Sequence, residues 1–387
     1  MSGSFFRLIF RNAWRHRLRS GLTVLGMVVA ILAFGLLGTV VDAWYAGAEG
    51  AAANRLITRS SISLVFPLPL TYKDKIRAMD GVRDLSWANW FGGIYKEPKN
   101  FFAQFAVDGE SYFRLYPEFV VPEAQMRDFL RDRKGCIVGR KLADTYGFKV
   151  GDTLTLKGTI YAGNWDFVVR GIYDGAKKGT DQSQMFLHWA YLNEVVKAKM
   201  PGRANNVGVF IAEVTGADQV AAVSRAIDAE FVNSRAETLT ETEKAFQLGF
   251  VAMTEAIVVA IRIVSYLVIF IIMAVMANTM SMTARERTAE YATLKALGFS
   301  PGFVAALICG ESLMLAGAGG LIGIGLTFPV ATAFAAKMGT LFPVFNVSEA
   351  TVLLQAGCAL TVGVVAALLP MRRVARLAIV DGLRAVA

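Results

Sequence analysis

Four long apolar segments constrain this sequence more than any other feature. The clearest is residues 22–41, which contain no charged side chain. An α-helix needs ~20 apolar residues to cross the ~30 Å hydrocarbon core of a bilayer, so this segment is long enough to span it. Three further segments carry at most one charge each, at residues 257–277, 304–334 and 350–369. Hydrophobic residues make up 55% of the chain, above the ~45–50% of soluble domains. We therefore expect an α-helical membrane protein with four transmembrane helices.

The region between the first and second segments has ordinary polarity and is long enough for one or two folded domains. Its pattern predicts a large mixed α/β extracytoplasmic domain, because short β-prone runs alternate with amphipathic ones. The pattern from residue 244 onward predicts one continuous helix, a stalk, that runs into the second span. The expected strands are residues 61–66, 166–169 and 207–214, and the expected helices are residues 71–79 and 217–231.

Arginine-rich segments set the expected orientation, since short loops rich in Lys and Arg stay in the cytosol. Such segments precede the first span, join the second to the third, and follow the fourth. Both termini are therefore expected in the cytosol and the protein in the cytoplasmic (inner) membrane, and the net charge of +9 mostly reflects this topology. Nucleic-acid binding is not expected, because the basic residues flank apolar spans and no recognition fold follows.

The expected organisation follows from these spans and charges. It comprises an N-terminal cytosolic amphipathic helix at 1–21, transmembrane helix 1 at 22–45, the extracytoplasmic domain at 46–243, the stalk with transmembrane helix 2 at 244–283, a cytosolic helical connection at 284–302, transmembrane helix 3 at 303–336, a short extracytoplasmic loop at 337–349, transmembrane helix 4 at 350–370 and a cytosolic tail at 371–387.

No catalytic or metal-binding motif accompanies these spans. The sequence has no phosphate-binding Gly-x-x-x-x-Gly-Lys-Ser/Thr loop, only two histidines, and no Cys or His pair with metal-ligand spacing. We expect neither an autonomous enzyme nor a cofactor or metal bound by this chain.

The third span carries a glycine ladder and one acidic residue. Gly317, Gly319, Gly320 and Gly323 offer the small-residue spacing at which membrane helices approach closely, so this span is expected to pack against a neighbour within the subunit. The alternative is that glycine is simply common in membrane helices. Glu311 is costly at membrane depth unless paired, and we interpret it as a structural residue that caps or pairs near the cytosolic connection.

Three segments together resemble the FtsX/MacB family of ABC transporter permeases. They are RNAWRHRLRSGLTVLG at residues 11–26, ERTAEYATLKALGFS followed by GESLMLAGAGGLIGIG at residues 286–325, and RRVARLAIVDGLRAV at residues 372–386. The sequences CIVGRKLADTYGFKVGDTLTLKG and WDFVVRGIYDG are similar to the extracytoplasmic MacB-type core domain of that family.

The resemblance implies a permease that dimerises with a second copy or a paralogue and couples to a dimer of cytosolic ABC ATPase subunits. ATP and Mg would be held by those subunits, and motion would pass through the stalk by mechanotransmission. It further implies export or extraction of a lipid, lipoprotein, peptide or drug, with a periplasmic adaptor as a further partner and membrane lipid around the spans. A non-transporting subunit that activates a cell-wall hydrolase remains an alternative, as does a receptor without an ATPase.

The cytosolic connection is the expected ATPase-coupling helix. Its spacing leaves Glu286, Glu290 and Lys295 exposed and places Tyr291, Leu294 and Leu297 on one apolar stripe that could dock into a groove, and Gly298 ends it. The alternative interpretation is an ordinary solvated helix between two spans.

Overall fold

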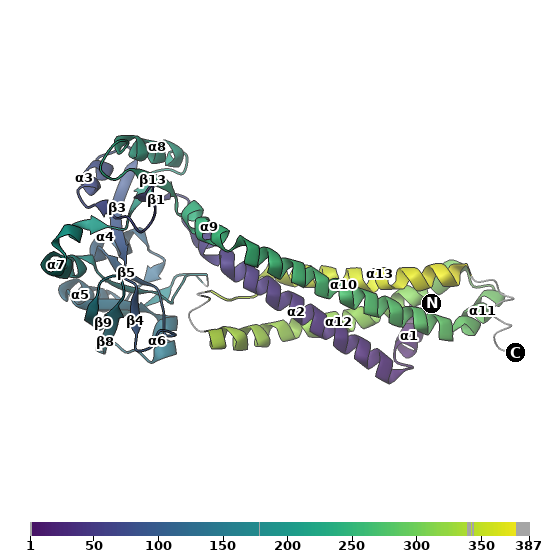
Figure 1. The fold of residues 1–387 in the computed structure, drawn as a ribbon. Helices are drawn as coiled ribbons and strands as arrows, with labels where there is room; N and C mark the ends of the chain where they lie inside the picture. Colours follow the sequence, from purple (N-terminus) through teal and green to yellow (C-terminus); the bar gives the residue numbers. More distant parts are fainter. Residues whose placement is uncertain (1, 178, 339–341, 343, 377–387) are drawn as a thin grey trace. The chain divides into compact units, whose positions relative to one another are not determined.

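The computed structural model describes residues 2–177, 179–338, 342 and 344–376 (Figure 1). They form two compact units. The helical unit comprises residues 2–42, 255–337 and 345–376, and the inserted unit comprises the described residues from 43 to 254 with residues 338, 342 and 344. Parts of the predicted loop 337–349 and tail 371–387, namely residues 339–341, 343 and 377–387, lie outside the described residues.

Four helices of the described chain are long and apolar enough to cross a membrane. They are α2 (Arg17–Gly50), α10 (Glu255–Glu286), α12 (Pro301–Met338) and α13 (Glu349–Ala375). A helix satisfies every backbone polar group within its own segment, which is why apolar segments of this length adopt it. The predicted fold class is confirmed, since a mixed α/β domain lies between the first and second of these helices. The helices extend beyond the predicted spans by several residues at most ends.

The glycines of α12 divide between two neighbours in the helical unit. A Cβ at Gly319 would lie 2.6 Å from the Met27 Cβ and 3.0 Å from the Val24 carbonyl oxygen of α2. One at Gly323 would lie 3.0 Å from the Val28 carbonyl oxygen, also of α2. Gly320 instead faces α13, and a Cβ at Gly317 would meet nothing within 4 Å among the described residues. The structure therefore places three of the four glycines at contacts between helices of one chain.

The N-terminal helix α1 (Ser2–Ala13) is shorter than the predicted segment 1–21, because a turn at residues 14–16 separates it from α2. Its Ile9 and Ala13 are buried. A Cβ at Gly310 of α12 would lie 2.6 Å from the Ile9 Cδ1, so α1 packs on the bundle through this face. Phe10, on the other side, is 60% exposed.

The inserted unit is built on an 11-stranded sheet with order β13-β1-β12-β3-β5-β10-β7-β9-β8-β4, in which β6 pairs β9 off this path. A separate two-stranded sheet pairs β11 with β2. The strands are β1 (Arg55–Ser60), β2 (Leu68–Pro69), β3 (Val82–Trp90), β4 (Gly93–Tyr95), β5 (Gln104–Val107), β6 (Phe119–Val120), β7 (Gly135–Gly139), β8 (Thr153–Gly158), β9 (Gly163–Gly175), β10 (Met185–His188), β11 (Asn206–Val207), β12 (Val209–Val214) and β13 (Thr238–Thr242).

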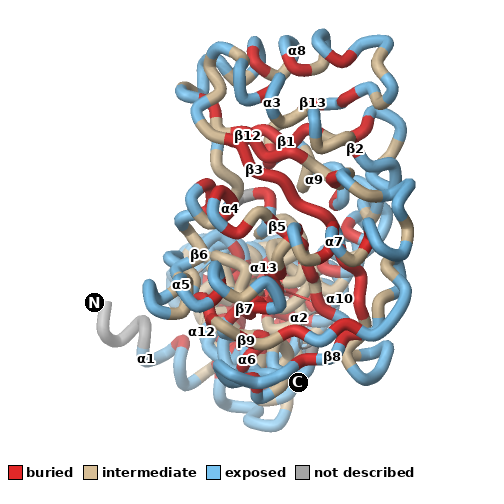
Figure 2. The backbone as a smooth tube through the Cα atoms, turned by 90° about the vertical axis from the view of Figure 1, so that its left-hand side faces the viewer, coloured by how far each residue is buried: buried red, intermediate tan, exposed pale blue. Residues whose placement is uncertain are grey.

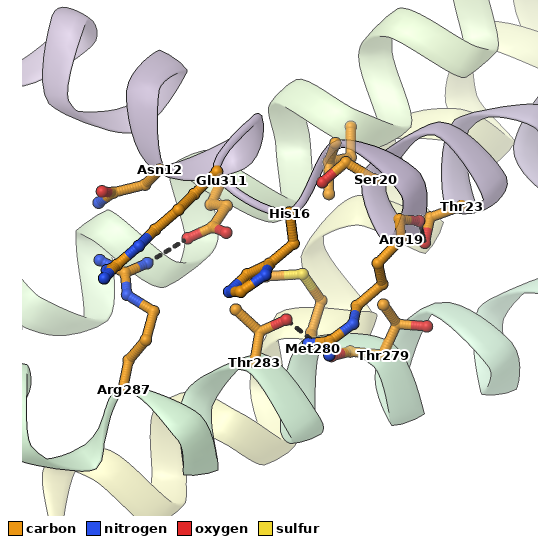
Figure 3. A pocket seen from close by; sticks show the side chains of 12 residues that line it. Asn12, His16, Arg19, Ser20, Thr23, Thr279, Met280, Thr283, Arg287 and Glu311 are labelled. Atoms are coloured by element: carbon orange, nitrogen blue, oxygen red, sulfur yellow. Dashed lines mark hydrogen bonds and ion pairs between the residues drawn. The ribbon is translucent and has the colours of Figure 1, made fainter.

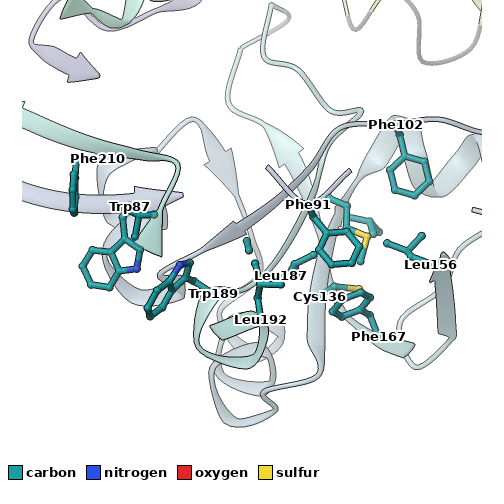
Figure 4. Packing of buried hydrophobic residues seen from close by; sticks show 14 of the residues in the cluster. Trp87, Phe91, Phe102, Cys136, Leu156, Phe167, Leu187, Trp189, Leu192 and Phe210 are labelled. Atoms are coloured by element: carbon teal, nitrogen blue, oxygen red, sulfur yellow. The ribbon is translucent and has the colours of Figure 1, made fainter. Parts of the chain in front are cut away.

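Helices cover this sheet, and the strands they cover are buried along most of their length (Figure 2). The helices are α3 (Tyr72–Arg77), α4 (Gly109–Leu115), α5 (Glu123–Arg131), α6 (Arg140–Tyr146), α7 (Trp189–Lys199), α8 (Val220–Glu230) and α9 (Glu243–Met253), with a 3₁₀ turn at Pro201–Arg203. The core holds several aromatic pairs, such as Trp87 and Trp189, whose rings meet edge-on with centroids 6.1 Å apart (Figure 4). Such pairs add to the free energy gained by burial.

Two predictions for this region are wrong. Residues 61–66 are not a strand, because β1 ends at Ser60 and the chain then turns. In this turn the Phe66 N–H donates to the Ser63 carbonyl at 3.1 Å, and the Val65 N–H donates to the Ser63 hydroxyl at 3.3 Å. Serine offers the backbone such local hydrogen bonds and so favours turns over strands. The other strands and helices predicted here overlap observed elements.

The predicted continuous stalk is also interrupted. Helix α9 ends at Met253 and α10 begins at Glu255, because Thr254 has φ −112° and ψ 11°. Its hydroxyl donates to the Val251 carbonyl at 2.9 Å and accepts from the Trp44 indole N–H at 2.7 Å. A side chain that bonds the preceding turn competes with the regular helix at this point.

Candidate functional site

The connection between α10 and α12 forms a sharply bounded helix, α11 (Thr288–Ala296). Arg287 precedes it with a non-helical φ of −104°, so Glu286 belongs to α10. At the other end Gly298 has φ +92°, its N–H donates to the Lys295 carbonyl, and the Phe299 N–H donates to the Leu294 carbonyl, both at 3.1 Å. This is a Schellman motif, which needs a left-handed residue after the helix and explains the glycine.

The apolar stripe predicted on α11 does not face outward as a whole. Tyr291 is only 2% exposed and packs into the core of the helical unit, and Leu294 is partly buried against the same core. Leu297 is 72% exposed and Phe299 is 43% exposed. The prediction that Tyr291 lies on a docking face is therefore wrong. The reason is that α11 joins two bundle helices and turns most of its apolar face toward them.

Arg287 is the centre of a charged network at the start of α11. Its Nε donates to the Glu290 Oε2 at 2.9 Å. Its Nη1 donates to the Glu311 Oε2 at 3.0 Å (Figure 3). Arg287 and Glu311 are both buried, and the guanidinium lies 5.2 Å from the centre of the Tyr291 ring. Glu311 is thus an ion-pair partner, which offsets the cost of a carboxylate in an apolar helix.

The corner between α1 and α2 contributes two more arginines. Arg19 forms two hydrogen bonds to the carboxylate of Glu286, at 2.7 and 2.8 Å. Arg15 pairs with Glu290. Asn12 and His16 from the same corner line a small hollow together with Arg287 and Glu311 (Figure 3). Planar guanidinium groups suit this two-point recognition of carboxylates.

The far end of α11 is held by Lys295. Its ammonium donates to the carbonyl oxygens of Val374 and Ala375, at 2.7 and 3.1 Å, in the last turn of α13. A cation is favourable at the carboxyl end of a helix, where the carbonyls lack helical partners. Side chains therefore tie α11 and the residues that flank it to α2, α12 and α13, and α10 leads directly into it.

The electrostatics of the site keep its charges fixed near neutral pH. Burial opposes ionisation of Glu290, but the hydrogen bonds from Arg15 and Arg287 outweigh it and lower the pKa of this carboxyl. Burial raises the pKa of Tyr291 to about 12, so its hydroxyl stays neutral. No group of three or more His, Cys, Asp or Glu side chains that could hold a metal ion exists within the described part of the chain. With its pKa lowered, the Glu290 carboxylate stays charged near neutral pH, and its ion pairs with Arg15 and Arg287 stay formed.

The sequence pattern indicates Glu286, Glu290, Lys295 and Glu311 but not their partners. It explains Arg15, Arg19 and Arg287 by membrane topology alone. The available signal was that three acidic residues near the second and third spans needed basic partners.

Comparison with known proteins agrees with this architecture. The model of the FtsX-like permease C-terminal domain matches residues 262–379, and the model of the MacB-like periplasmic core domain matches residues 20–230. The chain belongs to the FtsX/MacB family of ABC transporter permeases. An uncharacterized ABC transporter permease of Methanocaldococcus jannaschii is 24% identical over 97% of this chain and 96% of its own length.

Two solved structures are also similar to this permease over about half of its chain. The extracellular domain of the noncanonic ABC-type transporter YknZ from Gram-positive bacteria is 13% identical, with a TM-score of 0.35 over 49% of this chain and 100% of its own. The periplasmic region of MacB from Actinobacillus actinomycetemcomitans is 7% identical, with a TM-score of 0.36 over 52% of this chain and 94% of its own. Family membership makes the chain a multi-pass membrane protein and implies an ATPase partner.

Proposed function

We propose that this permease couples ATP hydrolysis by a separate cytosolic subunit to movements of the inserted unit, without a channel through the bilayer. Those movements drive export or extraction of a lipid, lipoprotein, peptide or drug. The observation that carries the proposal is the arrangement of α11 and its flanking residues. Leu297 and Phe299 after the helix are exposed, and side chains tie this segment to α2, α12 and α13. A subunit that pushes on this corner would act on the whole bundle at once.

The orientation in this proposal follows from the charges, and the partners follow from the family. The arginine-rich ends of the spans lie in the cytosol, so both termini are cytosolic, α11 faces the ATPase, and the membrane is the cytoplasmic one. The partner ATPase dimer binds ATP and Mg, and this chain binds no cofactor. A second copy or a paralogue completes the permease, and an adaptor joins the inserted unit. Ion pairs around Arg287 keep α11 from moving alone, so displacement of α11 displaces the bundle.

The test is affinity purification of the tagged full-length chain in mild detergent, with mass spectrometry of the proteins that accompany it. The variant is Leu297→Asp, since a side chain that is 72% exposed can become charged without disturbing the core. The matched control is Leu239→Asp, at an exposed leucine of β13. We expect an ABC ATPase with wild type and with the control, and its loss from Leu297→Asp.

Three other results would change the proposal. An ATPase that still copurifies with Leu297→Asp would contradict docking at the carboxyl end of α11. Absence of any ATPase, under conditions that preserve other membrane complexes, would contradict the coupled permease and favour a receptor. A cell-wall hydrolase recovered in place of an adaptor would replace export by hydrolase activation.

A further inference from the structure

A buried arginine lies where the chain enters and leaves the inserted unit. Arg55 begins β1, shortly after α2 ends, and Glu243 begins α9, through which the chain leaves. As whole residues, Arg55 is 3% exposed and Glu243 is 6% exposed. The Arg55 Nε donates to the Glu243 Oε2 at 2.7 Å. Entry and exit are therefore joined by a charged contact that water hardly reaches.

The same arginine also binds the body of the inserted unit. Its Nη1 donates to the Leu115 carbonyl at 2.9 Å and its Nη2 to the Glu118 Oε1 at 2.5 Å. The guanidinium lies 4.0 Å from the centre of the Tyr116 ring, and the Tyr116 hydroxyl donates to the Glu243 Oε1 at 3.0 Å. Each guanidinium nitrogen has an acceptor, as a buried charge requires. We name Arg55, Glu118, Glu243 and Tyr116 the junction cluster.

Entry and exit lie side by side beyond the junction cluster as well. The Ala52 N–H donates to the Glu243 Oε2 at 3.3 Å, and the Trp44 indole N–H donates to the Thr254 hydroxyl at 2.7 Å. Between these points a Cβ at Gly47 would lie 2.8 Å from the Gln247 Oε1. The end of α2 and the whole of α9 therefore run alongside each other as an antiparallel pair within the inserted unit.

We propose that the junction cluster is a force-bearing joint, which makes the end of α2, α9 and the sheet move as one body when the helical unit changes conformation. The inference rests on the proposed function for the source of the motion. Sliding α9 along β1 would leave the buried Glu243 carboxylate without its cation and the Arg55 Nε without its acceptor, so the cluster opposes that movement. Exposed ion pairs of the unit, such as Arg140–Asp174, oppose movement far less because solvent screens them.

The joint can be tested without knowing the substrate. Spin labels are placed at Gly249→Cys of α9 and Lys157→Cys of β8, two exposed positions of the inserted unit, in a chain whose Cys309 and Cys358 are replaced by alanine. Cys136 is fully buried and stays. Electron–electron double resonance then gives the label distance in the complex with its ATPase, nucleotide-free and with ATP trapped. We expect one narrow distance that is the same in both states.

The variant combines Arg55→Met with Glu243→Gln. It leaves no charge at the Arg55–Glu243 contact and keeps an oxygen for the Tyr116 hydroxyl. Glu118 loses its cation, but its side chain is 25% exposed and reaches water, so the unit is expected to fold. We expect the ATPase to remain bound while the label distance broadens and shifts between nucleotide states. The matched control, Arg140→Met with Asp174→Asn, also removes an ion pair of the inserted unit and should keep the wild-type distance.

Two results would overturn the joint: a wild-type distance that shifts with nucleotide, or a variant distance as narrow and constant as wild type. If the variant fails to fold, Tyr116→Phe removes one hydrogen bond and no charge, and an unchanged distance in that variant would also contradict the joint. Absence of a copurifying ATPase would contradict the proposed function instead, and the joint would then be decided by the width of the nucleotide-free distance in variant and wild type.

Discussion

Removal of one partner of the buried Arg287–Glu311 pair should destabilise the helical unit far more than removal of both. Glu311→Leu leaves the Arg287 Nη1 without its acceptor, and Arg287→Met leaves a carboxylate that is 4% exposed without its cation. Breaking a buried pair from one side costs ~3–5 kcal/mol. Because Arg287 keeps Glu290 and the Glu311 carboxylate can become protonated, we expect each single variant to lose about 3 kcal/mol, the lower end of that range.

The double variant Arg287→Met/Glu311→Leu contains no unpaired charge at this place. Addition of the single effects would give about 6 kcal/mol, whereas apolar replacement of a buried pair is often close to neutral. We expect the double variant to lose no more than about 3 kcal/mol, so the coupling free energy should be about 3 kcal/mol or more. The Arg15–Glu290 pair is a control from the same network, since its side chains are 56% and 42% exposed. The double-mutant cycle of this exposed pair should give a coupling free energy of less than ~1 kcal/mol.

The assay is titration of the purified chain in detergent micelles with sodium dodecyl sulfate, followed by far-ultraviolet circular dichroism. Most of the helical signal comes from the spanning helices, so the midpoint and slope give the free energy of unfolding of the helical unit. Additive effects of Arg287→Met and Glu311→Leu would refute the reasoning, because they would mean that the two side chains do not depend on each other.

Three further predictions concern the same unit. Gly319→Val should lower the denaturation midpoint or block assembly, since even a Cβ at this position would lie 2.6 Å from the Met27 Cβ. Gly317→Val should be tolerated, because a Cβ there meets nothing within 4 Å among the described residues. An equal loss of stability in both variants would contradict the packing. Gly298→Ala should cost about 1 kcal/mol in the same titration, because φ is +92°, and a neutral result would mean that this turn is not fixed. The pKa of Glu290 is lowered in the folded state, so its contribution is present above the unfolded pKa of ~4.3 and lost as pH falls through the folded value. Wild type should therefore lose stability more steeply than Glu290→Gln in acid, and identical acid profiles would exclude this contribution.

The spans could be predicted because the bilayer imposes a simple requirement. A helix that crosses it needs a minimum length without charge, and residues 22–41 satisfy this requirement without reference to any other part of the chain. The ends of the helices were less predictable, since helices continue into polar sequence wherever caps and neighbours allow. The break between α9 and α10 at Thr254 is an example, because it depends on a hydroxyl that also accepts a hydrogen bond from the Trp44 indole.

The candidate site was only partly predictable, for a related reason. Periodicity placed Tyr291, Leu294 and Leu297 on one side of a helix but could not say whether that side faces solvent or the bundle. Arg287 and Glu311 are separated by 24 positions and meet only because the Gly298 turn reverses the chain. Ion pairs between distant segments depend on the tertiary fold, which the charge pattern of one sequence does not contain.

The pairing of Arg19 with Glu286 has a consequence for the order of synthesis. The two residues are 267 positions apart, with the whole inserted unit between them. At a synthesis rate of ~5–20 residues per second, Arg19 emerges roughly 13 to 53 s before its carboxylate. Throughout that interval, in which the first span and the whole inserted unit are made, this arginine lacks the carboxylate that it pairs with in the folded chain. The Arg287–Glu311 pair forms only when the third span has been made, and the Lys295 contact with the last turn of α13 only when the fourth has, so the contacts of α11 record the order in which the bundle is built.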